Sequence, residues 1–385
     1  MITVSHPTVN QYVRTLVTAL SRAGKLESFH TTLAFGRRKM DIPTSEVRQH
    51  PFPEAVRLIC ERLRWQPPIR QEGGWASVDA VARELDRIVA RTLNRTEAVY
   101  CYEDSALETF RTAREAGIRR YYELPILYWE TGKRLLDEEA ERYPDWERTL
   151  EGNRDSPEKQ RRKTEELRLA DLVICPSRNV QQSLPAGTSS IVALYGCPEP
   201  EGGPKRKTGN KLRILFAGAL SQRKGLADIF AAMRQLRRTD VELVLFGALK
   251  AELEFYRTEC SSFVYEPPRP NRELRQLMFS CDALALPSIV EGRAMVQLEA
   301  LSCGLPIIVT PNAGAEDLVE PGVTGFLVPV RSPEKIAEAI DWIADHRQWL
   351  DDVRPAILNK AKQCSWEGYT EKILAAISRV GRNEL

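Results

Sequence analysis

Short apolar, β-rich runs alternate with amphipathic segments along the whole 385-residue chain. Helical spacing of apolar positions occupies the intervals, with 9–20 and 76–93 as the clearest cases. This alternation predicts stacked βα units and parallel sheets. The predicted strands are 2–5, 29–35, 97–102, 118–124, 171–177 and 190–196 in the first half, and 212–218, 241–247, 262–265, 282–288, 306–310 and 325–329 in the second.

A segment of different amino-acid composition separates the two halves of the chain. The segment 198–211, "PEPEGGPKRKTGNK", is rich in proline, glycine and charge and has no apolar periodicity. Such composition is typical of an interdomain linker. We therefore predict an α/β fold of two Rossmann-like domains, one at 1–200 and one at 206–363.

Composition excludes several classes of protein. No stretch approaches the roughly 20 apolar residues of a membrane span, and the N-terminus does not have the pattern of a secretory leader. The eight cysteines are scattered without a CxxC pair, which favours reduced thiols in the cytoplasm. With 55 basic and 53 acidic side chains, the net charge of +2 argues against nucleic-acid binding.

The first loop that suggests chemistry is "GALSQRKG", Gly218 to Gly225, after the strand at 212–218. Ligands of open α/β sheets collect at the carboxyl ends of strands, and Arg223 and Lys224 precede a predicted helix there. The free N–H groups of a helix N-terminus already favour an anion, and two cations strengthen that preference. The loop thus predicts a phosphate site, with a solvated Arg-Lys turn as the alternative.

A second loop, "EGRAMVQLE", carries Glu291 and Glu299 eight positions apart. The rise of a helix keeps these carboxylates on the order of 10 Å apart. Paired glycosidase acids lie roughly 5 to 9.5 Å apart, so separate roles are favoured. Gly292 lets a ligand approach the backbone, while Glu299 suits a diol such as a ribose. The two loops together predict a pocket for a sugar nucleotide.

These motifs closely resemble the retaining glycosyltransferases of family four, which have the two-domain GT-B fold. The matches are Arg223-Lys224-Gly225, "LVLFG" at 243–247, "LPSIVEG" at 286–292, and "EALSCGLPIIVTPNAGAEDLVEPGVTGFLVP" at 299–329. The resemblance implies that Arg223 and Lys224 contact the donor diphosphate and that Glu299 binds the ribose. It implies that Glu291 and the backbone after it hold the transferred sugar and phosphate, and that the final helix, at about 364–385, packs back on the first domain. The donor-binding set implied in this way is Gly218, Arg223, Lys224, Glu291, Gly292, Arg293, Ala294, Met295 and Glu299.

Departures from the family pattern leave alternatives open. Arg293 stands where an aromatic residue is usual, and it either contacts a phosphate or a carboxylated sugar or faces solvent. Tyr102 lies at about the position of a family histidine and is either a catalytic group or a packing residue; an ordinary tyrosine is a poor base at neutral pH. The leaving phosphate can itself accept the proton in retaining transfer. Candidates for the acceptor side of the cleft are His6, Thr8, Asn10, Glu103, Asp104 and Glu123.

No Asp-x-Asp motif occurs and the four histidines are dispersed, so we expect no metal site, with Arg223 and Lys224 stabilising the leaving diphosphate. The missing G-x-G-x-x-G motif disfavours a dinucleotide cofactor, and the expected co-substrate is a UDP- or GDP-linked sugar.

Two basic segments bear on where the acceptor binds, and the first leaves two alternatives open. Basic and apolar residues mix in 55–70, which fits either a helix on an anionic membrane or packing against the first sheet, whereas 159–168 is predicted to be a solvated helix.

The function predicted is transfer of a sugar to a glycan or lipid-linked acceptor in bacterial polysaccharide or glycoconjugate synthesis. A sugar-nucleotide epimerase on the same fold and a non-catalytic sugar-nucleotide-binding protein remain as alternatives.

Overall fold

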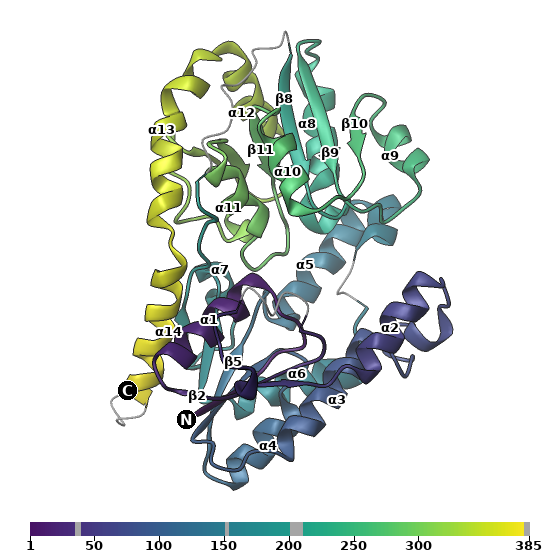
Figure 1. Ribbon diagram of the computed structural model, residues 1–385. Helices are drawn as coiled ribbons and strands as arrows, with labels where there is room; N and C mark the ends of the chain where they lie inside the picture. Colours follow the sequence, from purple (N-terminus) through teal and green to yellow (C-terminus); the bar gives the residue numbers. More distant parts are fainter. Residues whose placement is uncertain (35–39, 151–153, 201–210, 381–385) are drawn as a thin grey trace.

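The computed structural model describes residues 1–34, 40–150, 154–200 and 211–380. Two α/β domains lie one above the other, and the last two helices run along one side of both (Figure 1). The last described residues lie beside the N-terminal domain, where the Lys25 ammonium donates to the Ser378 hydroxyl at 3.0 Å.

The N-terminal domain contains seven parallel strands in the order β3-β2-β1-β4-β5-β6-β7. Helices cover both faces (Figure 1), which explains why a strand such as 172–175, "LVIC", is apolar throughout rather than alternating. The strands are β1 (Ile2–Ser5), β2 (Leu26–Thr31), β3 (Val47–Gln49), β4 (Ala98–Tyr102), β5 (Arg119–Glu123), β6 (Leu172–Cys175) and β7 (Ser190–Val192). The helices are α1 (Gln11–Arg22), α2 (Phe52–Arg62), α3 (Val78–Ala90), α4 (Leu107–Glu115), α5 (Trp129–Arg142), α6 (Pro157–Leu169) and α7 (Arg178–Gln182).

The C-terminal domain contains six parallel strands in the order β10-β9-β8-β11-β12-β13. Its strands are β8 (Leu212–Ala217), β9 (Val241–Phe246), β10 (Val264–Glu266), β11 (Ala283–Leu286), β12 (Ile307–Val309) and β13 (Gly325–Leu327). Its helices are α8 (Leu226–Leu236), α9 (Leu253–Glu259), α10 (Asn271–Met278), α11 (Met295–Ser302), α12 (Pro333–Asp345) and α13 (Gln348–Gln363). The predicted pair of Rossmann-like domains is confirmed, and the predicted strands agree with these elements to within a few residues.

Two chain crossings join the domains. The backbone N–H of Cys197, near the end of the first domain, donates to the carbonyl of Cys364 at 2.7 Å. Helix α14 (Trp366–Val380) then packs beside α1, with Tyr195 stacked near Trp366. The linker residues 201–210 lie outside the described residues, so the boundary between the domains stays a prediction.

A further connection between the domains is not evident from the sequence. The 3-10 helix η4 (Pro144–Thr149) follows α5 and carries Trp146, which is 1% exposed. Its indole packs edge-on against Phe230, Phe255 and Tyr256 of the C-terminal domain, at centroid distances of 5.6, 5.0 and 5.7 Å. A first-domain segment therefore contributes to the second core and limits how far the domains can separate.

Three expectations from the sequence are wrong in detail. The helix expected across 55–70 ends at Arg62, because Arg64 turns the chain at φ +55° and two prolines follow. Packing of that segment in the core is also wrong for Ile59, Leu63 and Trp65, which are 57%, 68% and 56% exposed. Helix α6 is not simply solvated, as described below. The short edge strand β3 was not predicted.

Candidate active site

The loop that we predict to bind phosphate lies at the carboxyl end of β8, and its conformation depends on two glycines. Gly218 has φ +146°, and a Cβ there would lie 2.9 Å from the Lys224 side chain. Gly225 has φ +77°, and a Cβ there would lie 2.1 Å from the Pro287 carbonyl oxygen. Only glycine combines these dihedral angles with this close packing. The glycines therefore bring Lys224 and the start of α8 against the loop that follows β11.

Arg223, Lys224 and Glu291 meet between these two loops. The Lys224 ammonium contacts a Glu291 carboxylate oxygen at 2.5 Å, and the Arg223 guanidinium lies 3.7 Å from the same oxygen. Burial opposes ionisation of Glu291, but the two cations outweigh it and lower the pKa of the carboxyl. The group is therefore an anion at neutral pH. The structure thus brings Glu291 together with two cations that lie 67 and 68 positions earlier in the sequence.

The N-terminal domain supports this cluster directly. The Ser221 hydroxyl donates to the Thr149 carbonyl at 2.7 Å, and the backbone N–H of Gln222 donates to the Thr149 hydroxyl at 3.1 Å. A Cβ on Gly292 would lie only 1.7 Å from the carbonyl oxygen of Pro125, so the two domains touch at this glycine. These contacts were not predictable, because they join segments that are distant along the chain.

Arg293 does not face solvent, which was one of the two alternatives predicted for its side chain. It is 3% exposed, and its guanidinium forms a bidentate pair with Asp317 at 2.6 and 3.0 Å. It also donates to the Gly314 carbonyl at 3.0 Å. The Arg293 side chain therefore fixes the loop in front of α11, and its contact with a phosphate or a carboxylated sugar stays a prediction.

Helix α11 presents its N-terminus after this loop. Ala294 is the N-cap residue, and its own N–H donates to the Ala313 carbonyl at 3.2 Å. Met295 opens the helix and lines a groove of about 1370 Å³. A helix N-terminus of this kind favours an anionic group.

Glu299 lies one turn further along α11 and lines the same groove. Its carboxylate accepts a hydrogen bond from the Asn271 amide at 2.7 Å. Burial raises the pKa of Glu299, and the Asn271 hydrogen bond opposes part of the rise. Arg14 of α1 and Arg272 of α10 also line the groove, so both domains contribute to it. Asn271, which the sequence did not single out, is the residue that orients Glu299.

The candidates of the N-terminal domain divide into two groups. His6, Tyr102 and Glu123 form the first, at the carboxyl ends of β1, β4 and β5. The His6 ring lies 4.3 Å from the Tyr102 ring, and burial lowers the pKa of His6 to about 3, against a hydrogen bond from Thr8. Burial also raises the pKa of Tyr102 and raises that of Glu123 to about 8. All three side chains are therefore uncharged at neutral pH.

Asn10 has a structural role beside this group. Its side-chain oxygen accepts from the N–H of Val13 at 3.1 Å and so caps α1. This cap aligns α1, whose Val13, Leu16 and Val17 are buried in the core.

Glu103 and Asp104 form the second group, with α6. Lys163 lies 3.6 Å from Glu103 and 3.8 Å from Asp104, and Lys159 lies 3.7 Å from Asp104. Burial raises the pKa of Glu103 to about 7 although Lys163 opposes the rise. This buried network contradicts the solvated helix expected at 159–168.

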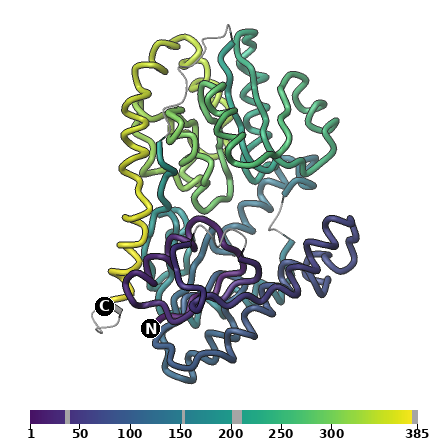
Figure 2. Tube along the Cα trace, in the orientation of Figure 1, coloured from purple at the N-terminus to yellow at the C-terminus, as the bar shows by residue number. Residues whose placement is uncertain are grey.

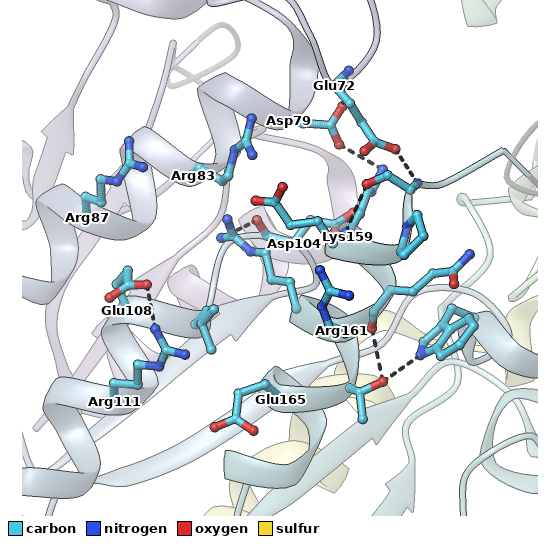
Figure 3. A pocket seen from close by; sticks show the side chains of 18 residues that line it. Glu72, Asp79, Arg83, Arg87, Asp104, Glu108, Arg111, Lys159, Arg161 and Glu165 are labelled. Carbon is cyan, nitrogen blue, oxygen red and sulfur yellow. Dashed lines mark hydrogen bonds and ion pairs between the residues drawn. The ribbon is translucent and has the colours of Figure 1, made fainter.

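The same network borders a groove of about 810 Å³ between α3, α4 and α6. Figure 3 shows Arg83 and Arg87 from α3, Arg111 from α4 and Arg161 from α6 around Asp104. Acidic side chains such as Glu108 and Glu165 line it as well (Figure 3), so the groove is charged but not uniformly basic. No group of three or more metal-ligating side chains occurs in the described part of the chain.

Similarity to solved structures extends over the whole chain. HepE of Anabaena, solved in complex with UDP, aligns with a TM-score of 0.63 at 16% identity, covering 98% of this chain and 99% of HepE. Sucrose-phosphate synthase of Thermosynechococcus elongatus aligns with a TM-score of 0.68 at 15% identity, covering 99% of both chains. At these identities the likeness establishes the fold alone.

Sequence comparison adds the family. The D-inositol 3-phosphate glycosyltransferase of Paenarthrobacter aurescens is 25% identical over 396 residues, covering 93% of this chain and 90% of the relative. A glycosyltransferase of Methanocaldococcus jannaschii is 30% identical over 163 residues, covering 41% of each chain. Residues 202–363 match the family described as "Glycosyl transferases group 1". The C-terminal domain is therefore similar to the group 1 glycosyltransferases, and the two domains of the chain have the GT-B fold.

Proposed function

We propose that the chain is a retaining, metal-independent glycosyltransferase that moves a sugar from a UDP- or GDP-linked donor to a glycan or lipid-linked acceptor. The observation that carries the proposal is that Arg223, Lys224 and Glu291 meet beyond the carboxyl ends of β8 and β11. Glu299 lies in α11, the next helix after Glu291. Solved neighbours that hold UDP and UDP-glucose support a uridine donor as the first to be tested.

In the proposed reaction, Arg223 and Lys224 bind the diphosphate and stabilise the charge that develops when the glycosidic bond breaks. Preorganised cations of this kind are among the largest electrostatic contributions to catalysis. The ion pair between Lys224 and Glu291 breaks when Lys224 binds the diphosphate. The Glu291 carboxylate can then accept hydrogen bonds from the hydroxyls of the transferred sugar. Glu299, held by Asn271, binds the ribose.

No residue of the His6, Tyr102 and Glu123 group is suited to act as a strong base. Tyr102 holds its proton tightly, and His6 is neutral but 1% exposed. The proposal therefore assigns the acceptor's proton to the departing phosphate. Tyr102, the most accessible of the three, then contacts the acceptor or shapes its site. A bacterial polysaccharide or glycoconjugate is the setting that we propose for the acceptor.

The test is thermal stabilisation by a panel of nucleotides and nucleotide-sugars in the presence of a chelator. A ligand at about 100 times its Kd adds about 2.7 kcal/mol to the folded state. We expect Arg223→Ala and Glu299→Ala to abolish the shift. Lys335→Ala is the matched control, because Lys335 forms an exposed pair with Glu338 on α12, outside the site.

The outcomes separate the proposal from its rivals. A shift that requires a divalent cation would refute metal independence. Nucleotide release that occurs without any acceptor, together with a changed sugar, would indicate an epimerase, and binding without turnover over a broad acceptor panel would indicate a binding protein. Retention is tested by NMR of the anomeric configuration of the first product.

A further inference from the structure

Large apolar side chains are exposed together around α2 and the chain that leads to α3. Ten large apolar side chains are strongly exposed in the described part of the chain, and six of them lie in this region. We call these six the apolar tip: Phe52, Ile59, Leu63, Trp65, Trp75 and Val78, with exposed fractions of 72%, 57%, 68%, 56%, 61% and 67%. Clustered exposure of this kind marks an interaction surface.

The backbone of the apolar tip is well defined, so the exposure does not come from a loose loop. The N–H of Trp65 donates to the Cys60 carbonyl at 2.8 Å, and the N–H of Ala76 donates to the Pro68 carbonyl at 2.9 Å. A Cβ on Gly74 would lie 2.3 Å from the Pro68 carbonyl oxygen, which requires glycine at this close approach. Cys60, Pro68 and Ala76 fill the interior, and the large side chains are left outside.

The unpaired charges around the apolar tip are positive except for Glu72, whose carboxylate accepts a hydrogen bond from the backbone N–H of Ser156 at 2.9 Å. Arg57 satisfies both nearby acids, Glu54 and Glu61. Arg62, Arg64 and Arg70 are exposed and form no ion pair within the described residues. Three unpaired arginines beside two exposed tryptophans match a surface that is anionic outside and apolar beneath.

Shape favours a broad partner over a small ligand. Helix α2 and the turn after it protrude from the side of the N-terminal domain, away from its sheet (Figures 1 and 2). Small-molecule sites are concave, whereas this surface is convex. No helix in the described part of the chain has the length and apolar character needed to cross a membrane.

We propose that the apolar tip docks on a bilayer containing anionic phospholipids. The side chains of Leu63, Trp65 and Trp75 enter the boundary between headgroups and acyl chains, and the three arginines pair with lipid phosphates. Docking through this tip holds the N-terminal domain at the membrane surface. The inference does not depend on the proposed reaction, because the tip contains none of the donor-site residues.

The experiment is co-sedimentation with vesicles of phosphatidylcholine, with and without phosphatidylglycerol. We expect strong binding only to the vesicles that contain phosphatidylglycerol. Leu63→Ser with Trp65→Ser should weaken that binding at least tenfold, and neutralising an arginine by Arg62→Gln or Arg64→Gln should weaken it about fivefold. Leu327→Ser, a 43% exposed apolar residue of the C-terminal domain, is the matched control.

Trp65→Phe should keep the binding but lose part of the fluorescence quenching by brominated phosphatidylglycerol. The far-UV circular dichroism spectrum and the Tm of the same variants should be unchanged, which shows that each variant is folded whether or not the proposed function is right. The proposal is overturned by absence of binding to either vesicle, by equal binding to both, or by binding that the Leu63 and Trp65 changes leave intact. It is also overturned if those changes instead dissociate a dimer, since the occupant is then a second copy of the chain.

Discussion

A substitution at Glu123 tests whether the buried group of His6, Tyr102 and Glu123, beneath the proposed acceptor site, is uncharged. It is 1% exposed at the end of β5, and neither carboxylate oxygen makes a hydrogen bond to the described residues. Burial raises its pKa from 4.5 to about 8, with the Tyr100 hydroxyl opposing part of the rise. We expect Glu123→Gln, which cannot ionise, to alter how the stability depends on pH.

The sign of the effect follows from proton linkage. Between the unfolded pKa of 4.5 and the folded pKa of about 8, the folded protein holds the proton that the unfolded chain releases. The contribution of Glu123 to stability is therefore fully present below pH 4.5 and is lost as the pH rises to about 8. Each pKa unit corresponds to about 1.4 kcal/mol, so the loss between pH 5 and pH 8 is about 4 kcal/mol.

The assay is urea unfolding of the wild type and the variant at pH steps across this range. The free energy of unfolding of Glu123→Gln should rise relative to the wild type by about 1.4 kcal/mol per pH unit. Comparing the two proteins cancels the other buried acids and His6, which are present in both. Glu130→Gln, at an exposed carboxylate of α5, is the control. A stability difference that does not change with pH would refute the assignment of a buried, protonated Glu123.

Three other changes test the remaining parts of the structure. Trp146→Ala removes the indole that enters the core of the C-terminal domain and should lower the free energy of unfolding by about 3 to 5 kcal/mol. Calorimetry of the variant should then resolve two transitions. A single transition unchanged from the wild type would contradict the role of Trp146 in joining the domains. Glu291→Gln releases Lys224 and should bind UDP at least as tightly while losing turnover; titration calorimetry that finds weaker binding would count against a diphosphate role for Lys224. A hydrogen bond from Cys197 lowers the pKa of Cys364 to about 7, although burial opposes this shift. Iodoacetamide at pH 7 should therefore alkylate Cys364 first. Mass spectrometry that finds the buried Cys101 modified earlier would contradict this prediction.

The meeting of Arg223, Lys224 and Glu291 was predictable from sequence because its signals are local. Arg223 and Lys224 follow a strand that ends in glycine, and Glu291 follows another apolar strand, so the rule that ligands collect at the carboxyl ends of parallel strands brings them together. The sequence could not indicate that Lys224 is already paired with Glu291. It also could not indicate that Arg293 is taken by Asp317, since that pair joins two loops 24 positions apart.

The contacts between domains were not predictable for the same reason, and they bear most on how the enzyme works. Trp146, Thr149 and Pro125 belong to the first half of the chain, yet they touch the second core, the phosphate loop and Gly292. None of these three residues belongs to a periodic pattern or a motif. Each makes its interdomain contact with a residue more than 70 positions away, so local sequence cannot predict the contact. Because these contacts end on the loops that carry Arg223 and Glu291, the distance between the domains and the geometry of the donor site are coupled. Opening the domains must therefore disturb Arg223 and Lys224, and closing them must restore the arrangement in which we propose that both side chains contact a diphosphate.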